Sequence, residues 1–360
     1  MERARIILCT GAPGSGRHAC LEEMMHVVPA DKKNEVKLFR LRDLMLELAQ
    51  ERGISATEET ILDLPEETRR VLRGWSVEKI LVEAQSAKVC IVSTPASFIW
   101  KKRPIRGLEF ADVQKLNPEL FLTIIDDVFR VRRTLRNERQ WQGQEFTLED
   151  IAEWRQREIE AVQDFVRIYF PQTRRHYLFA RDHPPDVLYD LIFSTHKNKV
   201  YFSYGITHAD EKALERVKAL ISKLRDHYVV FDPLTIKDHL LVEGLKELSG
   251  DRRIRITISY RTGKETFDEP ADEVEEASKV MDTQIVTRDY QMVDNSDIVV
   301  AYLPGVELAT GVICEIVRGY TYGKPVYTYH PHEASPFLAY HCTKLFTDEN
   351  EFVQFLLRAA

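Results

Sequence analysis

Short apolar runs alternate along this chain with longer amphipathic stretches, and no other feature of the sequence limits the possible folds so strongly. Runs of this kind, separated by helical patterns, are typical of βαβ units built around a parallel sheet. We therefore predict an α/β fold with helices on both faces of each sheet. The runs that we expect to form strands lie at 5–9, 36–40, 88–93, 120–125, 199–203, 228–231, 254–259, 297–303 and 325–329.

A chain of 360 residues is long enough for two such cores. The most loop-like region near its centre contains Pro171 and Pro184, and residues 195–199 then lead into what reads as a fresh first strand. We predict two three-layer α/β/α domains, at 1–195 and 196–360. Three further expectations concern single segments: a long helix at 148–169, a helix at 209–227, and a surface excursion of the second domain at 261–277.

The composition excludes several classes of protein. There are 57 acidic residues against 50 Lys and Arg, a net charge of −7, which argues against a protein that coats duplex nucleic acid. No apolar run approaches the roughly 18 residues that span a membrane, and the chain reaches Gly11 too soon for a signal peptide. The 5 cysteines are far apart, without a CxxC pair. We therefore expect reduced thiols and a cytoplasmic location.

A glycine-rich segment follows the first expected strand and precedes a helical pattern. It fits GxxxxGK[ST], except that Arg17 stands for the lysine and His18 for the hydroxyl residue. Glycines let backbone N–H groups wrap a phosphate at a helix N-terminus, while the lysine and hydroxyl serve the phosphates and Mg²⁺. The nucleotide-binding candidates in this segment are Gly11, Gly14, Ser15, Gly16, Arg17 and His18.

From this point the first half resembles the archaeal-type adenylate kinases, over roughly residues 1–180. The residues Ser93-Thr94-Pro95-Ala96 stand where that family has Asp-Thr-His-Ala, and 104–108 resembles its substrate loop. The arginine-rich segment 130–139 resembles its lid. The resemblance implies that Arg132, Arg133 and Arg139 contact phosphate; the alternative is a solvated helix face.

The departures from that family fall on the groups that hold Mg²⁺ or neutralise the transferred phosphoryl group: Arg17, His18 and Ser93. Three interpretations remain open. In the first, this half is a retired kinase fold kept for binding or scaffolding. In the second, it is a nucleotide sensor, and in the third, a working nucleoside monophosphate kinase that uses Arg17. ATP or ADP, with or without Mg²⁺, is the expected cofactor of this half.

In the second half, carboxylates flank an expected strand. Asp289 precedes Asp297 by eight residues, and Glu315 follows Asp297 by eighteen, in a helical pattern after a glycine turn. Ligands of open α/β sheets gather at the carboxyl ends of strands. Taken singly, such a Glu reads as a helix cap or surface charge, and such an Asp as the usual start of a strand.

This spacing resembles the nucleoside 2-deoxyribosyltransferases and the related deoxynucleoside 5′-monophosphate N-hydrolases, over about residues 198–330. Gly323-Lys324-Pro325-Val326 and the opening 200–207 also match that family. The resemblance implies a flavodoxin-like fold, Glu315 as a nucleophile that attacks C1′, Asp289 as proton donor, and a homo-oligomer, with no cofactor. It implies substrate contacts from Tyr201, Tyr204, Gly205, Asp297 and Gly311.

Where the transferases carry an Asp two positions before the loop glycine, this chain has Ala309, so cleavage is expected rather than base exchange. The predicted function is therefore cleavage, or transfer, of the N-glycosidic bond of a nucleoside or its 5′-monophosphate. A non-catalytic nucleotide sensor and an ATP-dependent nucleoside monophosphate kinase remain the alternatives. No metal site is predicted, because His330 and His332 lack a third ligand.

Overall fold

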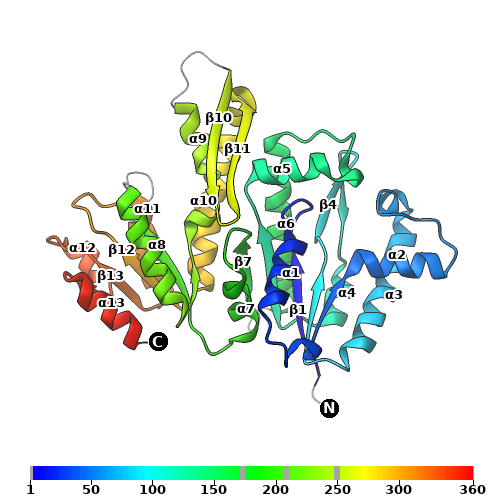
Figure 1. Cartoon of the computed structure of the whole chain (residues 1–360), viewed down its shortest axis with the longest axis horizontal. Helices are drawn as coiled ribbons and strands as arrows, with labels where there is room; N and C mark the ends of the chain where they lie inside the picture. The colour runs from blue at the N-terminus through cyan, green and yellow to red at the C-terminus, as the bar shows by residue number, and fades with distance from the viewer. Residues whose placement is uncertain (1–2, 171–174, 206–210, 247–251, 360) are drawn as a thin grey trace. The chain divides into compact units, whose positions relative to one another are not determined.

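The computed structural model describes residues 3–170, 175–205, 211–246 and 252–359. The chain divides into two compact units, each made of two segments (Figure 1). Unit 1 contains Met1–Asp182 and Lys237–Gln284, and unit 2 contains His183–Ile236 and Ile285–Ala360. Among the described residues, no helix combines the length and apolar character needed to cross a lipid bilayer.

Unit 1 is built on a five-stranded parallel sheet with the order β2-β3-β1-β6-β7. All six residues of β6 are buried, as expected for a strand covered on both faces. The strands are β1 (Arg5–Thr10), β2 (Val36–Arg40), β3 (Val89–Ser93), β6 (Leu120–Ile125) and β7 (His176–Ala180). The helices are α1 (Arg17–Val27), α2 (Leu41–Glu51), α3 (Glu66–Ala84), α4 (Phe110–Leu116), α5 (Val128–Asn137) and α6 (Leu148–Tyr169).

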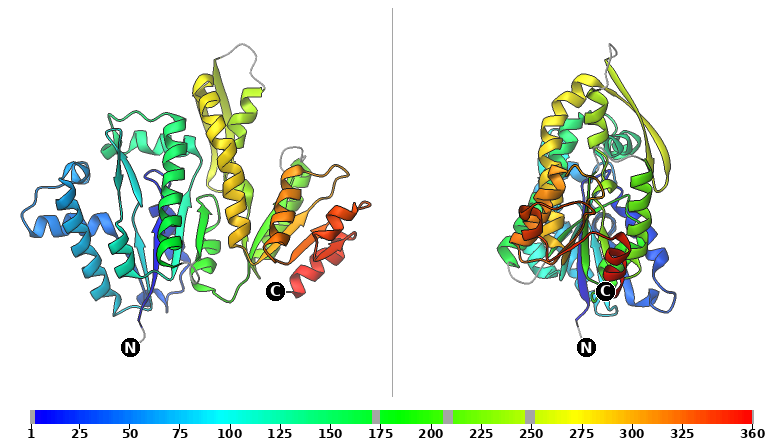
Figure 2. Two further views of the ribbon diagram at one scale, coloured as in Figure 1. Left: turned by 180° about the vertical axis from the view of Figure 1, so that it is seen from behind. Right: turned by 90° about the vertical axis from the view of Figure 1, so that its left-hand side faces the viewer.

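Smaller elements complete the first segment of unit 1: the hairpin of β4 (Ser97–Trp100) and β5 (Arg103–Arg106), and three 3-10 turns, η1 (Lys33–Glu35), η2 (Ile61–Asp63) and η3 (Arg139–Trp141). The second segment, 237–284, supplies α9 (His239–Lys246), β10 (Arg253–Tyr260), β11 (Gly263–Pro270) and the first part of α10 (Ala271–Asn295). The antiparallel hairpin of β10 and β11 lies beside α9 and α10 (Figure 1, Figure 2).

Unit 2 has its own five-stranded parallel sheet, in the order β9-β8-β12-β13-β14. In chain order this is the 2-1-3-4-5 arrangement of flavodoxin-like folds. It predicts a ligand site at the carboxyl ends of the neighbouring strands β8 and β12, where the chain connections leave in opposite directions. The strands are β8 (Lys199–Tyr204), β9 (Val229–Phe231), β12 (Ile298–Tyr302), β13 (Val326–Tyr329) and β14 (Lys344–Phe346). The helices are α7 (Pro185–Phe193), α8 (Glu211–Arg225), α11 (Thr310–Thr321), α12 (Pro336–Tyr340) and α13 (Glu349–Arg358), with a 3-10 turn η4 (Pro233–Thr235).

Every apolar run that we predicted as a strand overlaps one to within a residue at each end, and the helix predicted at 148–169 is α6. The division of the chain differs from the predicted boundary at 195/196, because 237–284 belongs to unit 1. The segment predicted as a surface excursion of the second domain, 261–277, is instead β11 and the start of α10. The reason is packing: Ile258 and Phe267 join the core cluster that contains Phe129 of α5.

Candidate functional site

The glycine-rich segment of unit 1 forms a loop between β1 and α1 that only glycine permits at key positions. Gly11 and Gly14 have φ values of 147° and 80°, which side-chain-bearing residues rarely adopt. A Cβ on Gly11 would lie 2.6 Å from the carbonyl oxygen of Ile124. The sequence therefore uses these glycines to bring the loop close to the neighbouring strand β6.

A buried carboxylate that the sequence analysis did not single out holds this loop. Glu158 of α6 accepts hydrogen bonds at Oε1 from the backbone N–H groups of Gly11 (2.9 Å) and Ala96 (2.7 Å). Its Oε2 accepts from the backbone N–H (2.7 Å) and the hydroxyl (2.8 Å) of Ser97. A signal was present in the sequence, because Glu158 lies four residues from both Trp154 and Val162, on the apolar stripe of the helix.

Arg17 turns into the loop. Its Nε donates to Ser93 Oγ at 2.9 Å, and its Nη1 donates to the carbonyl of Gly11. The side chain is only 6% exposed. Burial, together with the charges of Arg17, Arg40 and Arg42, lowers the pKa of His18 to about 3, so this imidazole is neutral at pH 7. A neutral imidazole and the serine hydroxyl of Ser93 replace the hydroxyl and the carboxylate that hold Mg²⁺ in P-loop kinases, and these residues do not fit the ion.

A cavity of about 350 Å³ opens over this loop. Seven arginines contribute to its lining, against two glutamates. Those arginines are Arg17, Arg40, Arg42, Arg69, Arg73, Arg106 and Arg181. Another part of the lining is apolar, and its side chains are chiefly those of Met45, Ile61, Leu62, Phe98 and Trp141. The loop candidates Gly14, Ser15, Gly16, Arg17 and His18 line the cavity as well.

The lid arginines lie elsewhere in unit 1. Arg132 pairs with Glu269 and Glu273, and Arg133 pairs with Glu265 while its guanidinium lies 4.5 Å from the ring centre of Phe267. Arg139 is exposed, outside the cavity lining. The structure therefore places Arg132 and Arg133 on acids of β11 and α10, because the segment 237–284 packs against α5.

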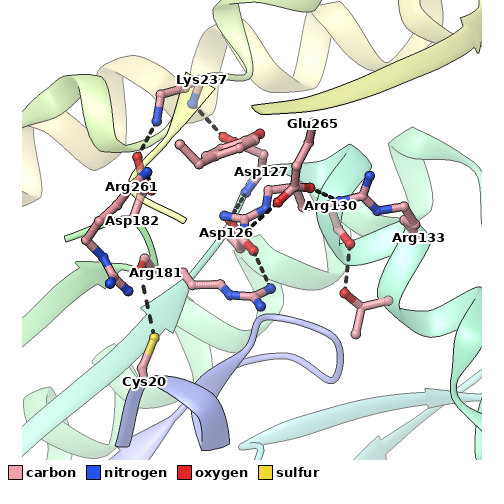
Figure 3. Close-up of polar contacts among 12 residues, drawn as sticks. Cys20, Asp126, Asp127, Arg130, Arg133, Arg181, Asp182, Lys237, Arg261 and Glu265 are labelled. Atoms are coloured by element: carbon pink, nitrogen blue, oxygen red, sulfur yellow. Dashed lines mark hydrogen bonds and ion pairs between the residues drawn. The ribbon is translucent and has the colours of Figure 1, made fainter. Parts of the chain in front are cut away.

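Two adjacent aspartates follow β6, and the second of them, Asp127, binds the same segment (Figure 3). Asp126 pairs with Arg130 (3.2 Å) and Arg181 (3.1 Å), while Asp127 Oδ2 accepts from the hydroxyl of Tyr260 at 2.6 Å. Burial and the charges of Asp238 and Asp126 raise the pKa of Asp127 to about 7. Sequence analysis did not propose these carboxylates, although their place directly after a predicted buried strand was visible.

In unit 2 the structure brings Glu315 together with β8 and with Asp289. Glu315 lies in the second turn of α11 and accepts hydrogen bonds from Tyr201 Oη (2.9 Å) and from Ser203 Oγ. Tyr201 and Ser203 are two residues apart in β8, so both point to the same face of the sheet. Ser203 was missed by the sequence analysis, although this alternation from Tyr201 would have indicated it.

The charge state of the pair depends on burial. Burial, followed by the negative charge of Asp289, raises the pKa of Glu315 to about 7, and the hydrogen bonds from Ser203 and Tyr201 act in the opposite direction. Burial also raises the pKa of Asp289, while Arg288, 2.9 Å away, lowers it. Two nearby carboxylates with raised pKa values are suited to sharing one proton near neutral pH.

The remaining candidates of unit 2 do not join this cluster. Tyr204 donates to Asp232 at 2.8 Å from the other face of β8, and Asp297 accepts from the backbone of Lys199 at the amino end of that strand. Gly205 directly follows β8, where a Cβ would lie 3.2 Å from that of Ala309, and Gly311 is exposed in the first turn of α11. The predicted sugar-binding loop falls largely on 206–210, outside the described residues.

Comparison with known proteins agrees with the geometry of unit 1. Residues 10–152 match the family model of an AAA domain. The adenylate kinase of Methanothermobacter thermautotrophicus is 23% identical over 128 residues, which cover 34% of this chain and 63% of that enzyme. Unit 1 has the fold of a P-loop kinase. The match spans less than two thirds of the length of that relative, and only the kinase-like fold is taken from it.

Solved structures give distant matches. A 2-deoxyribosyltransferase from Bacillus psychrosaccharolyticus is 20% identical, with a TM-score of 0.27, covering 42% of this chain and 88% of that one. A conserved protein from Enterococcus faecalis is 14% identical, with a TM-score of 0.26, covering 46% of this chain and 99% of that one. At these TM-scores the superpositions carry no weight of their own, and the fold of unit 2 rests on its strand order.

Proposed function

We propose that unit 2 cleaves the N-glycosidic bond of a nucleoside or a nucleoside 5′-monophosphate, with Glu315 as the nucleophile. The observation that carries this proposal is the arrangement of Glu315 between two hydroxyl donors, Tyr201 and Ser203, with Asp289 close enough to raise its pKa. In retaining glycosidases one carboxylate attacks the sugar carbon and a second group manages the proton of the leaving group, and Glu315 and Asp289 would take these two roles.

The steps follow from the charges of the pair. The Glu315 carboxylate attacks C1′, the electron pair of the N-glycosidic bond leaves with the base, and Asp289 supplies the proton that the base takes up. Tyr201 and Ser203 favour the negative charge on Glu315, and Arg288 favours the charged form of both carboxylates. The reactive form holds one proton, on Asp289. Water then hydrolyses the glycosyl ester, or a second base resolves it; Ala309 in place of the transferase Asp favours water.

The test is chromatography of nucleosides and 5′-monophosphates, ribo and deoxy, after incubation with the protein. Wild type should release free base, and E315Q should release it at least about a thousandfold more slowly, because the nucleophile is gone. E333Q, at an exposed position of the same unit, is the matched control and should behave as wild type. Base release that survives in E315Q would rule out this nucleophile.

A second candidate function is nucleotide sensing with no turnover by either unit. The inward position of Arg17, hydrogen-bonded to Gly11 and Ser93, favours it over an ATP-dependent nucleoside monophosphate kinase. Nucleotides that raise the melting temperature without any product would support the sensor, since a ligand of the folded state adds to its stability. Phosphoryl transfer from ATP that is lost in R17A would support the kinase instead.

The glycosidase proposal includes an assembly and a location. We expect a homo-oligomer, which the resemblance of the second half to the deoxyribosyltransferases implies, and a cytoplasmic location, because the cysteines are widely spaced. The net charge of −7 favours small nucleosides or nucleotides over duplex nucleic acid as ligands. Light scattering during size-exclusion chromatography would measure the assembly, and a monomer at all concentrations would contradict that part of the proposal.

A further inference from the structure

The lining of the unit 1 cavity is positively charged, although the chain as a whole is negatively charged. The whole chain has a net charge of −7, yet the cavity lining holds seven arginines against two glutamates, a formal balance of +5. Arginine guanidinium groups bind phosphate with paired, charge-assisted hydrogen bonds. A local concentration of this kind indicates an anionic ligand, and the ligand's charge can be met by side chains alone.

Several of these arginines are oriented before any ligand arrives. Arg73 is held by Asp112 at 2.6 Å and by Glu109 at 3.4 Å, and neither acid lines the cavity. Arg69 donates to the carbonyl oxygens of Leu62 (2.6 Å) and Leu64 (3.0 Å). Because their positions are already fixed, these guanidinium groups lose little freedom when they bind a phosphate.

The other part of the lining is suited to a flat, apolar group. Phe98, Ile61, Leu62 and Met45 contribute to it, together with Trp141, whose ring makes edge contacts with Trp100 at 5.4 Å and Trp154 at 5.3 Å. A lining that combines aromatic and aliphatic side chains with guanidinium groups fits a molecule that carries a base at one end and phosphate at the other.

One buried side-chain atom of the loop has no hydrogen-bond partner among the described residues. Ser15 is 3% exposed and lines the cavity, and its hydroxyl makes no hydrogen bond within the part of the chain that the structure describes. A buried hydroxyl without a partner costs free energy unless a ligand atom satisfies it. A phosphate oxygen over the loop would accept this hydrogen bond.

The loop's own chemistry excludes the usual triphosphate arrangement. Arg17 donates to Gly11 and Ser93 within the loop, the strand-end carboxylate is replaced by Ser93, and His18 is uncharged. These are the positions that would serve the β- and γ-phosphates and Mg²⁺. The groups needed to hold the metal are therefore lacking, while cationic side chains are abundant.

We propose that the cavity of unit 1 binds a nucleotide through arginine side chains alone, without magnesium, and does not transfer its phosphoryl group. The proposal concerns unit 1 and does not depend on glycosidic chemistry in unit 2. The base lies against Trp141 and Phe98, and the phosphate is held by the arginine wall and the hydroxyl of Ser15.

Calorimetric titration of the full-length protein with AMP, ADP and ATP tests the proposal, in EDTA and again with excess Mg²⁺. At least one nucleotide should bind in EDTA, and Mg²⁺ should leave the affinity unchanged or weaken it by neutralising the phosphates. Binding that requires Mg²⁺, or transfer of labelled phosphate between ATP and AMP, would overturn the proposal. Inorganic phosphate that binds as tightly as the best nucleotide would also overturn it, because the apolar wall would then have no role.

Two variants locate the site. R42Q removes a cavity guanidinium that pairs with Glu58, which also belongs to the lining, and should weaken binding about tenfold. R157Q removes an arginine of α6 that pairs with Glu153 outside the cavity, and should leave the affinity unchanged. R40Q serves as a second cavity variant should R42Q not fold. Equal affinities in the cavity variants and in R157Q would place the ligand elsewhere.

Discussion

Glu315 is the residue whose ionisation decides the chemistry of unit 2. Its pKa is raised to about 7, and only its charged form can attack C1′. The ratio kcat/KM for base release is therefore expected to rise with pH as Glu315 ionises, and to fall again at higher pH once Asp289 loses the proton that it donates to the base. A pH–rate profile of the best substrate measures this, and a profile that is flat from pH 5 to 9 would assign the chemistry to another group.

The neighbours of Glu315 determine whether the rising limb of the pH–rate profile, where Glu315 ionises, shifts to higher or to lower pH. S203A removes a hydrogen bond that stabilises the carboxylate, so the limb should move to higher pH; D289N removes the charge that raises the pKa, so it should move to lower pH. The rate of D289N also falls, because the proton donor is lost. The comparison with wild type therefore uses only the pH at which the rate rises. Two variants with the wild-type limb would show that another group titrates.

Glu158 is expected to act on stability rather than on chemistry. E158Q puts an amide N–H₂ where the carboxylate accepts hydrogen bonds from Ala96 and Ser97, so at least one buried donor loses its partner. We expect a loss of about 1–3 kcal/mol in the free energy of unfolding of unit 1, measured by urea denaturation. The control E153Q lies on the exposed side of the same helix, and a loss of equal size in both variants would contradict the assigned role.

Sequence alone predicted part of each site, and strand alternation explains what it missed in unit 2. Glu315, Asp289 and Tyr201 were predicted and lie together. Ser203 was not predicted, although it shares a face with Tyr201, whereas Tyr204 was predicted and points to the opposite face. Family likeness selects residues by type and spacing, and only the period of the strand determines which face each one occupies.

Among the elements, the β10–β11 hairpin is where sequence reasoning failed most. The apolar run at 254–259 was predicted as a strand, but its antiparallel partner β11 reads as polar, because it contains four charged residues and a single aromatic, Phe267. Local propensity cannot reveal which core such a hairpin joins. The acids of β11 and α10 that face Arg132 and Arg133 come from residues more than 130 positions away along the chain.

The two faces of β11 give a matched pair of variants. Glu269 is buried against Arg132, which is itself only 2% exposed at its side chain, whereas its neighbour Asp268 pairs with Arg253 and Arg255 at the surface. E269Q should destabilise unit 1 by about 3 kcal/mol, because a buried guanidinium loses part of its compensation. D268N should change stability by less than about 1 kcal/mol. Thermal denaturation of both variants compares them, and equal losses would contradict the burial argument.

At the scale of the whole molecule, each unit is assembled from two separate segments of the chain. A fragment that ends at the predicted boundary, 1–195, lacks the segment 237–284 and therefore lacks the partners of Arg132 and Asp127. We expect this fragment to melt at a lower temperature than unit 1 of the intact chain, or to aggregate, as followed by circular dichroism. A fragment in which 1–182 is joined by a glycine linker to 237–284 should be more stable than 1–195. If both fragments melt at the same temperature, the assignment of 237–284 to unit 1 is contradicted.

The charge reversal at the cavity of unit 1 has a kinetic consequence. A chain of net charge −7 repels an approaching anion at long range, while the arginines attract it near the cavity. Salt screens the long-range repulsion first, because the screening length falls to about 10 Å at 0.1 M ionic strength and shortens further above it. The rate at which the cavity captures a nucleotide should therefore pass through a maximum at intermediate salt, rather than fall steadily as it does for a uniformly basic surface. Stopped-flow measurement of Trp fluorescence would follow this capture, and a steady fall from the lowest salt would contradict it.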